Sequence, residues 1–279
     1  MRHKDLSSVI LRAAGIIFIG LFAVITVFPL LQTVLISIKP IEEFTRNPLS
    51  LPQKIRLYNY VDAWVKGDLN ILFLNTVVVT AATVIFVILL ASPAGFTLSK
   101  LRIKGKKLIY NYFILGLIVP VQVIMIPLMK FARITGLSNS LTILIIIYVG
   151  MWLAFPVLIY TGFYKSIPYE IIEAARIDGC SIFTLFRKII FPMTAAVNLT
   201  VAIFVGKEPW RDFFVPLVFT TDKSKRTLAI GLFSFQTSYF NDWTIIFAMV
   251  VIMSVPLILL YIFMQKAFIS GIVGGAVKG

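Results

Sequence analysis

The 279-residue sequence has only one histidine, one cysteine and 12 acidic residues. With His3 and Cys180 alone, no His/Cys cluster offers a metal site and no internal disulfide can form. The same shortage leaves no nucleophile–base pair for covalent catalysis. The sequence also lacks G-x-x-x-x-G-K-(S/T), the phosphate-binding loop of many nucleotide hydrolases. These absences argue against an enzyme, and no catalytic residue is predicted.

Long polar stretches are scarce as well. Hydrophobic residues make up 59% of the chain, and its mean hydropathy is +0.96, far above that of a soluble domain. Five of six charge-free runs exceed the about 20 residues that a helix needs to cross a bilayer. The remaining run, Ile189–Gly206, has 18 residues and is marginal. The sequence therefore predicts an all-α membrane protein with six transmembrane helices, at Ala13–Ile38, Leu69–Ser99, Leu108–Met129, Ile134–Tyr164, Ile189–Gly206 and Trp243–Gln265.

The net charge of +14 resides between these runs, which argues against nucleic acid as the partner. With the N-terminus inside, the inner segments hold 14 of the 26 basic residues and four of the 12 acidic ones. The inner excess is then +10, against +4 outside, as the positive-inside rule requires. Both termini are expected in the cytoplasm. The first run has no A-x-A cleavage pattern, so we expect a retained helix.

The segment from Ser166 to Pro192 is the one long polar insertion that also has helical character. Pro168 suits a first helical position, acidic residues fill the opening turns, and Gly179 suits a left-handed stop. A second helical run, Ile182 to Ile190, ends at Pro192 and enters a membrane span. The pattern predicts two cytoplasmic helices separated by a glycine break.

This segment resembles the E-A-A-x-x-x-G-x9-I-x-L-P loop of ABC importer permeases, with Phe191 where the family usually has Leu. The family uses the loop as a coupling helix that docks in a cleft of a separate ATPase subunit. The resemblance implies an ATPase-coupling role for the following residues: Glu170, Glu173, Ala174, Ala175, Asp178, Gly179 and Pro192.

The C-terminus, from Gln265 to Gly279, is similar to the Q-(R/K)-x-(F/L)-x-x-G-(L/I)-x-x-G-(A/G)-V-K-G ending of carbohydrate-type permeases of the maltose and glycerol-phosphate kind. In maltose-type permeases this tail reaches between the ATPase subunits. The resemblance implies an ATPase-contacting tail that includes Gly275, Val277, Lys278 and Gly279.

The end of the fifth span departs from the family, since Lys207-Glu208-Pro209 replaces apolar residues and Arg211 replaces Asn. In one interpretation the helix ends near Gly206 and the charges lie at the outer interface. In the other the helix continues past Pro209 and the charges line a polar cavity. If Lys207 and Arg211 face the pathway, they favour an anionic or strongly hydroxylated solute, such as a uronate-containing oligosaccharide. The candidate pathway residues are Gln122, Lys207, Glu208, Trp210, Arg211 and Asp212.

The resemblance implies the permease fold of type I ABC importers. We expect four parts in the chain: an N-terminal arm and first helix (1–38), an extracytoplasmic segment (39–68), a core (69–266, with the coupling loop at 165–188) and a cytoplasmic tail (267–279).

The implied function is that of a permease subunit of an ATP-driven, binding-protein-dependent importer of an oligosaccharide or sugar derivative, in a bacterial-type inner membrane. Its coupling loop, 166–192, would link ATPase movements to alternating access. The implied partners are a second homologous permease, two ATPase subunits that carry ATP and Mg²⁺, a solute-binding protein and the bilayer; this chain needs no cofactor. The alternative is an ion-coupled secondary transporter, which usually needs ionisable groups deep in several spans.

Overall fold

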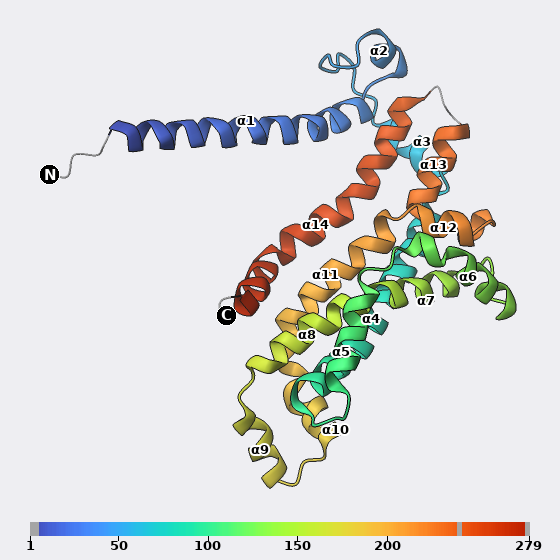
Figure 1. Ribbon diagram of the computed structural model, residues 1–279. Helices are drawn as coiled ribbons and strands as arrows, with labels where there is room; N and C mark the ends of the chain where they lie inside the picture. Colours follow the sequence, from blue (N-terminus) through green and yellow to red (C-terminus); the bar gives the residue numbers. More distant parts are fainter. Residues whose placement is uncertain (1–5, 239–241, 277–279) are drawn as a thin grey trace. The chain divides into compact units, whose positions relative to one another are not determined.

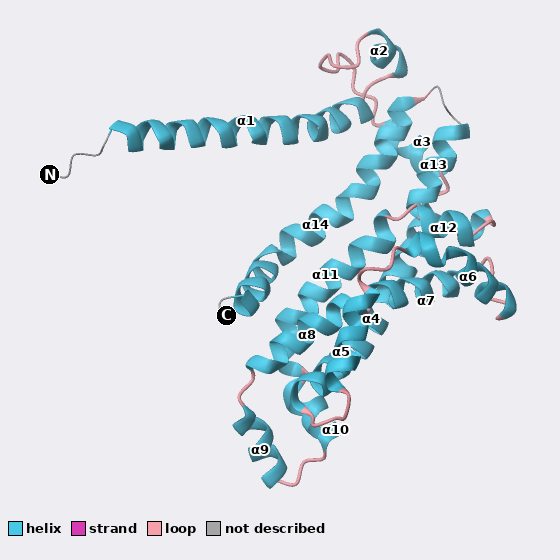
Figure 2. Cartoon of the chain, viewed as in Figure 1, coloured by secondary structure: helices cyan, strands magenta, loops and turns pink. Residues whose placement is uncertain are grey.

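The computed structural model describes the backbone of residues 6–238 and 242–276 and the side chains of residues 11–235 and 242–263 (Figure 1). All regular structure in these described segments is helical, as predicted (Figure 2). The chain forms two compact units. One comprises Met1–Asp68 with Leu232–Val255, and the other comprises Leu69–Gly231 with Pro256–Gly279.

In the first unit, the segment after α1 folds around buried polar groups. The ammonium of Lys39 is fully buried and donates hydrogen bonds to the carbonyls of Pro48, at 2.9 Å, and Ser50. The amide of Asn59 donates to the carbonyls of Ser37 and Lys39, at 2.9 and 2.8 Å. Since buried backbone acceptors need such partners, these two side chains fix the turn. The helices of this unit include α1 (Leu6–Ser37), α2 (Ile41–Arg46), α3 (Tyr58–Lys66) and the first part of α14 (Trp243–Ala276).

The second unit is built around α4, which packs along both α8 and α11. Gly95 of α4 is what allows the close approach to α8. A Cβ atom on Gly95 would lie 2.5 Å from the Cβ of Tyr160 and 2.9 Å from the backbone nitrogen of Thr161. The α-helices of this unit are α4 (Leu69–Lys100), α5 (Lys106–Gly116), α6 (Val121–Ile134), α7 (Leu141–Trp152), α8 (Ala154–Ser166), α9 (Tyr169–Ile177), α10 (Ile182–Leu185), α11 (Ala195–Arg211), α12 (Phe214–Phe219), the start of α13 (Leu228–Ser238) and the part of α14 from Pro256 on.

Among the described residues, four helices are long and apolar enough to cross a membrane, and two bent helix pairs bring the number to six if each pair forms one span. The predicted third span, Leu108–Met129, is not one helix. It consists of α5 and α6, which meet at 97°. Pro120 has extended backbone and caps α6, so the chain turns instead of continuing through the proline. The helix α6 then runs on to Ile134, beyond the predicted end.

The predicted fourth span, Ile134–Tyr164, begins later than expected, at Leu141, because residues 135–140 form a turn in which Gly136 and Asn139 have positive φ. It also bends by 48° between α7 and α8. Pro156 has no N–H to donate to the carbonyl of Trp152, four residues earlier, so the helical ladder is broken at this place.

The fifth span is longer than its apolar run, since continuous helical structure extends from Ile182 to Arg211. The helix therefore does not end near Gly206 but continues through Pro209. The second helical run of the loop, predicted to end at Pro192, continues into this span without a break. A π-helical turn, Phe186–Ile190, precedes Pro192, with the N–H of Phe191 donating to the carbonyl of Phe186 at 2.7 Å. Such a turn absorbs the local disruption that the proline causes.

Candidate functional site

The coupling-like loop presents α9 with one face packed and the other exposed. Ile172 and Ala175 are 2% and 4% exposed and pack into the core that also contains residues of α4, α8 and α11. Glu170, Glu173 and Ala174 are exposed. The spacing of three residues between Ile172 and Ala175 places both on one side of the helix. The acidic residues are therefore free to meet another protein.

The C-terminal end of α9 has the geometry that the glycine predicted. Gly179 has φ of +76°. Its N–H donates to the carbonyl of Arg176 at 3.0 Å, and the N–H of Cys180 donates to that of Ala175 at 2.9 Å. This pair of bonds is the Schellman motif, in which a left-handed residue closes a helix and satisfies its last carbonyls. The motif fixes the direction in which the chain leaves α9.

The start of the same loop is tied to the end of α4. The buried ammonium of Lys100 donates to the carbonyls of Ile167 and Lys165, at the C-terminal end of α8. A cation is favoured there because the helix dipole is negative at this end. The hydroxyl of Tyr169 donates back to the carbonyl of Lys100 at 2.9 Å. We call these contacts of Lys100 with Lys165, Ile167 and Tyr169 the latch.

A second feature is a cavity of about 310 Å³, here called the polar cavity, between α6, α7, α11 and α12. Its polar lining combines two carboxylates, a guanidinium, an amide, a phenol and an indole. The residues that line it are Val121, Gln122, Tyr148, Met151, Trp152, Glu208, Arg211, Asp212, Phe214 and Val215.

At the end of α11, two cations pair with one carboxylate. The guanidinium of Arg211 donates two hydrogen bonds of 3.0 Å to the two carboxylate oxygens of Glu208. The ammonium of Lys207 lies 3.5 Å from the same carboxylate and 4.8 Å from the centre of the Phe204 ring. Glu208 is only 5% exposed, so it needs these partners.

Asp212 is held differently, by neutral donors. Its carboxylate accepts hydrogen bonds from the hydroxyl of Tyr148, at 2.8 Å, and from the N–H groups of Phe214 and Val215, at 2.9 and 3.3 Å. None of the ion pairs of the described side chains includes Asp212. Its negative charge therefore remains without a cationic partner at the cavity wall.

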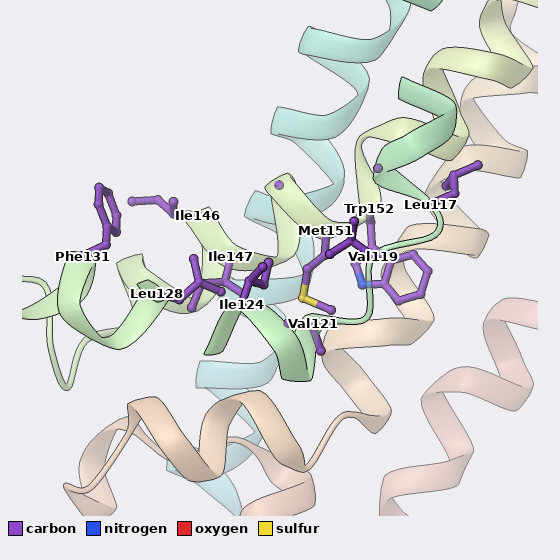
Figure 3. Close-up of a pocket in the computed structure, with 12 residues that line it drawn as sticks. Leu117, Val119, Val121, Ile124, Leu128, Phe131, Ile146, Ile147, Met151 and Trp152 are labelled. Carbon is purple, nitrogen blue, oxygen red and sulfur yellow. The ribbon is translucent and has the colours of Figure 1, made fainter. Parts of the chain in front are cut away.

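An apolar cavity of about 640 Å³ adjoins the polar one, where the chain turns between α5 and α6 (Figure 3). Val121, Met151 and Trp152 line both cavities. The indole N–H of Trp152 is buried and has no hydrogen-bond partner among the described side chains and backbone groups. An unpaired buried donor of this kind is uncommon in proteins.

The structure brings four of the six candidate pathway residues to the polar cavity: Gln122, Glu208, Arg211 and Asp212. Lys207 does not line it but pairs with Glu208. Trp210 is 8% exposed and packs edge-on against Phe73, with ring centres 5.5 Å apart.

Two cavity residues with polar side-chain groups, Tyr148 and Trp152, were not among the predicted pathway residues. Their spacing of four residues places two aromatic side chains with polar ends on one side of α7, which is the signal that could have identified them.

The remaining coupling candidates are located as follows. Asp178 is exposed and caps α9, whereas Pro192 begins a short 3₁₀ turn beyond the π-helical one. Of the tail, Gly275 lies within α14, where only the backbone is described, and Val277, Lys278 and Gly279 lie outside the described residues.

Comparison with known proteins identifies the family. Residues 88–273 match the family described as "Binding-protein-dependent transport system inner membrane component". The chain is 32% identical over 263 residues to the probable ABC transporter permease protein YurM of Bacillus subtilis, covering 94% of this chain and 87% of that protein. It is also 32% identical to the diacetylchitobiose uptake system permease protein NgcG of Streptomyces coelicolor, covering 92% and 86%.

Among solved structures, the fold matches a chain of a bacterial ABC transporter involved in the import of the acidic polysaccharide alginate. The TM-score is 0.85, with 96% of this chain and 100% of that chain covered, at 21% identity. At this identity the match shows the fold alone. The predicted ABC importer permease fold is therefore confirmed, and membership favours binding-protein-dependent transport over an ion-coupled carrier. The chain belongs to the family of binding-protein-dependent transport system inner membrane components.

Proposed function

We propose that this chain is one of two permease subunits of an ATP-driven importer of an oligosaccharide or sugar derivative. Family membership supports the transport mode, and a relative named for diacetylchitobiose uptake supports the substrate class. The observation that carries the proposal is α9, a helix with an exposed acidic face, a buried opposite face and a fixed glycine end. A helix with these features suits docking to a separate ATPase subunit.

The proposed coupling route starts at α9 and reaches the spans by two paths. At its C-terminal end, the Schellman motif directs the chain into α10 and then the fifth span. At its N-terminal end, the latch joins it to α4 and α8. A displacement of α9 by the ATPase subunits would therefore move three spans together, since packed helices transmit a shift as a unit.

The assembly that this proposal requires has a second homologous permease, two ATPase subunits and an extracytoplasmic solute-binding protein. ATP and Mg²⁺ would bind to the ATPase subunits. The 165–188 loop and both termini would lie in the cytoplasm, and the tail residues Gly275–Gly279 would contact the ATPase subunits. The division into arm, extracytoplasmic segment, core and tail belongs to the same proposal.

The test is ATP hydrolysis by the purified complex in lipid vesicles, with and without solute-loaded binding protein. We expect the loaded binding protein to stimulate the wild type, because docking and nucleotide-driven closure favour the same state. Glu173→Ala and Gly179→Asp should lose that stimulation. Gly136→Asp is the matched control, since Gly136 has a similar φ of +68° but lies in the turn between α6 and α7. Normal transport by the two loop variants would show that the loop is not the coupling element.

A further inference from the structure

We infer that a cavity between residues 100–107 and α9 holds the phosphate group of an anionic phospholipid. The cavity has a volume of about 490 Å³ and is lined by Lys100 and Arg102 on one side and by Glu173 and Arg176 of α9 on the other. We call it the basic cavity and residues 100–107 the basic turn. The inference rests on the proposed function, which places the basic turn at the cytoplasmic leaflet, and goes beyond it by assigning a lipid class and a site for it.

The charges that line the basic cavity favour an anion. Three cations and one carboxylate line it, so the lining has a net charge of +2. Among the described residues, neither Arg102 nor Arg176 forms an ion pair or a side-chain hydrogen bond, with Glu173 or any other group. Both arginines are exposed, so their donors are available to a ligand. A guanidinium presents its N–H groups in a planar fork that matches the oxygens of a phosphate.

The basic turn that carries Arg102 has a fixed form. The Lys100 ammonium is held at the end of α8 by the latch, and the Lys106 ammonium donates to the carbonyl of Ser99 at 3.0 Å. Gly105 reverses the chain with φ of +74° before α5 begins. Two lysines therefore close the turn through its carbonyls, and Arg102 is left as the cation that a ligand can use fully.

The place of the cavity and its apolar lining favour a lipid over a soluble anion. The basic turn begins where α4, a candidate span, ends. Leu101, Ile103 and Ile182 give the same cavity an apolar surface, which the glycerol and first acyl carbons of a phospholipid would cover. The basic turn also holds five basic residues and no acidic one, a pattern typical of segments that bind anionic lipid beside a span.

A phosphate bound to both arginines would join the basic turn to α9. Arg102 lies between α4 and α5, whereas Arg176 lies in the last turn of α9. The latch joins α4 to the other end of α9, at Tyr169. The lipid would thus act in parallel with the latch and hold both ends of α9. We therefore expect an anionic membrane to strengthen the coupling that α9 provides.

The experiment titrates lipid into the purified complex in detergent and measures bound lipid by native mass spectrometry. The probes are phosphatidylglycerol, which is anionic, and phosphatidylcholine, which has the same phosphate but no net charge. Inorganic phosphate in large excess is the soluble competitor. We expect the wild type to bind phosphatidylglycerol about tenfold more tightly than phosphatidylcholine. Inorganic phosphate should not displace the bound lipid.

The variants replace Arg102 and Arg176 by glutamine, which removes each charge and keeps a polar side chain. The double variant should bind phosphatidylglycerol about thirtyfold more weakly, and each single variant about fivefold more weakly. Arg187→Gln is the matched control, since Arg187 is an exposed arginine of the 166–192 loop that does not line the cavity, and it should bind lipid like the wild type. Binding-protein-stimulated ATP hydrolysis is also measured in vesicles of each lipid. Stimulation should be greater in phosphatidylglycerol for the wild type and equal in both lipids for the double variant.

The outcomes separate the inference from the proposed function. If loaded binding protein stimulates ATP hydrolysis in neither lipid, the proposed function fails, while the titration still reports the site. Equal affinity of the double variant and the wild type for phosphatidylglycerol would overturn the inference. Displacement of the lipid by inorganic phosphate would assign the site to a soluble anion. Loss of ATPase subunits from the double variant with unchanged lipid binding would assign it to the ATPase. Should the double variant not assemble, the two single variants decide, because each has its own expected loss of affinity.

Discussion

Lys100 and Tyr169 contact each other through a hydrogen bond and a cation–π interaction. The Tyr169 hydroxyl donates a hydrogen bond of 2.9 Å to the Lys100 carbonyl, and the Lys100 ammonium lies 5.5 Å from the centre of the Tyr169 ring. The same ammonium donates to the carbonyls that end α8. One lysine thus joins the end of one span, the end of another and the start of α9. In the proposed coupling route, this junction would carry a displacement of α9 to both spans.

Lys100→Met should weaken this junction. The substitution leaves two carbonyls without their charged donor, and such hydrogen bonds contribute about 2 kcal/mol. We expect a lower temperature of thermal inactivation and a loss of binding-protein-stimulated ATP hydrolysis, with basal hydrolysis retained. Lys104→Met, an exposed lysine of the same turn, is the control. Equal behaviour of the two variants would mean that the latch does not contribute to coupling.

Gly179→Ala should be costly although nothing surrounds the glycine. The structure has no atom within 4 Å of a Cβ placed there, so the expected penalty comes from φ of +76° alone. A left-handed residue with a Cβ costs about 1–2 kcal/mol, and asparagine less. We expect stimulated ATP hydrolysis to fall in the order glycine, asparagine, alanine. Gly136→Ala has the same backbone penalty outside the loop and should leave stimulation unchanged. An effect of Gly136→Ala as large as that of Gly179→Ala would point to general destabilisation.

Gly95→Ala tests the contact between α4 and α8. The added Cβ would lie 2.5 Å from the Cβ of Tyr160 and 2.9 Å from the backbone of Thr161, so the helices themselves would have to separate. Overpacking of this kind costs about 1–3 kcal/mol. We expect a lower yield of assembled complex and earlier thermal aggregation. In Gly162→Ala, on α8, the new Cβ meets no atom within 4 Å. If the two variants are equally stable, the close approach at Gly95 is not needed.

The position of Cys180 allows the proposed orientation to be tested without introducing a cysteine, because it is the only one in the chain. A membrane-impermeant maleimide should label it in inverted vesicles and not in right-side-out vesicles. Cys180 is partly buried, so Asp178→Cys in a Cys180→Ser background provides an exposed neighbour for comparison. Labelling of Asp178→Cys from the outside would reverse the proposed topology.

The fold class and the form of the 166–192 loop could be predicted because their signals are local. A run of apolar residues, a proline near a helix start and a glycine at a helix end each act within a few residues. The breaks in the third and fourth spans were harder to predict. A proline inside a span is compatible with a straight, kinked or broken helix, and the surrounding packing decides which occurs.

The polar cavity could be predicted only in part, for a similar reason. The charged residues of 207–212 can be identified because they follow directly on an apolar run. Tyr148 and Trp152 cannot, because aromatic residues are common throughout the predicted spans. Whether Arg211 pairs with Glu208 or faces a solute depends on side-chain rotamers, which no sequence pattern specifies.

Asn75 connects α4 to the segment that follows α12, and its amide should be needed there. Asn75 is 8% exposed and donates to the carbonyls of Ser224 and Arg226, at 2.8 and 2.9 Å. Asn75→Asp keeps the shape but removes both donors and buries a charge, which should cost about 3 kcal/mol or more. The segment contains Lys223, Lys225 and Arg226, so limited trypsin digestion followed by mass spectrometry reports its opening directly. We expect cleavage after these residues to accelerate at least tenfold in Asn75→Asp and to remain slow in Asn47→Asp, where the asparagine is exposed. Unchanged cleavage in Asn75→Asp would show that other contacts hold this segment in place.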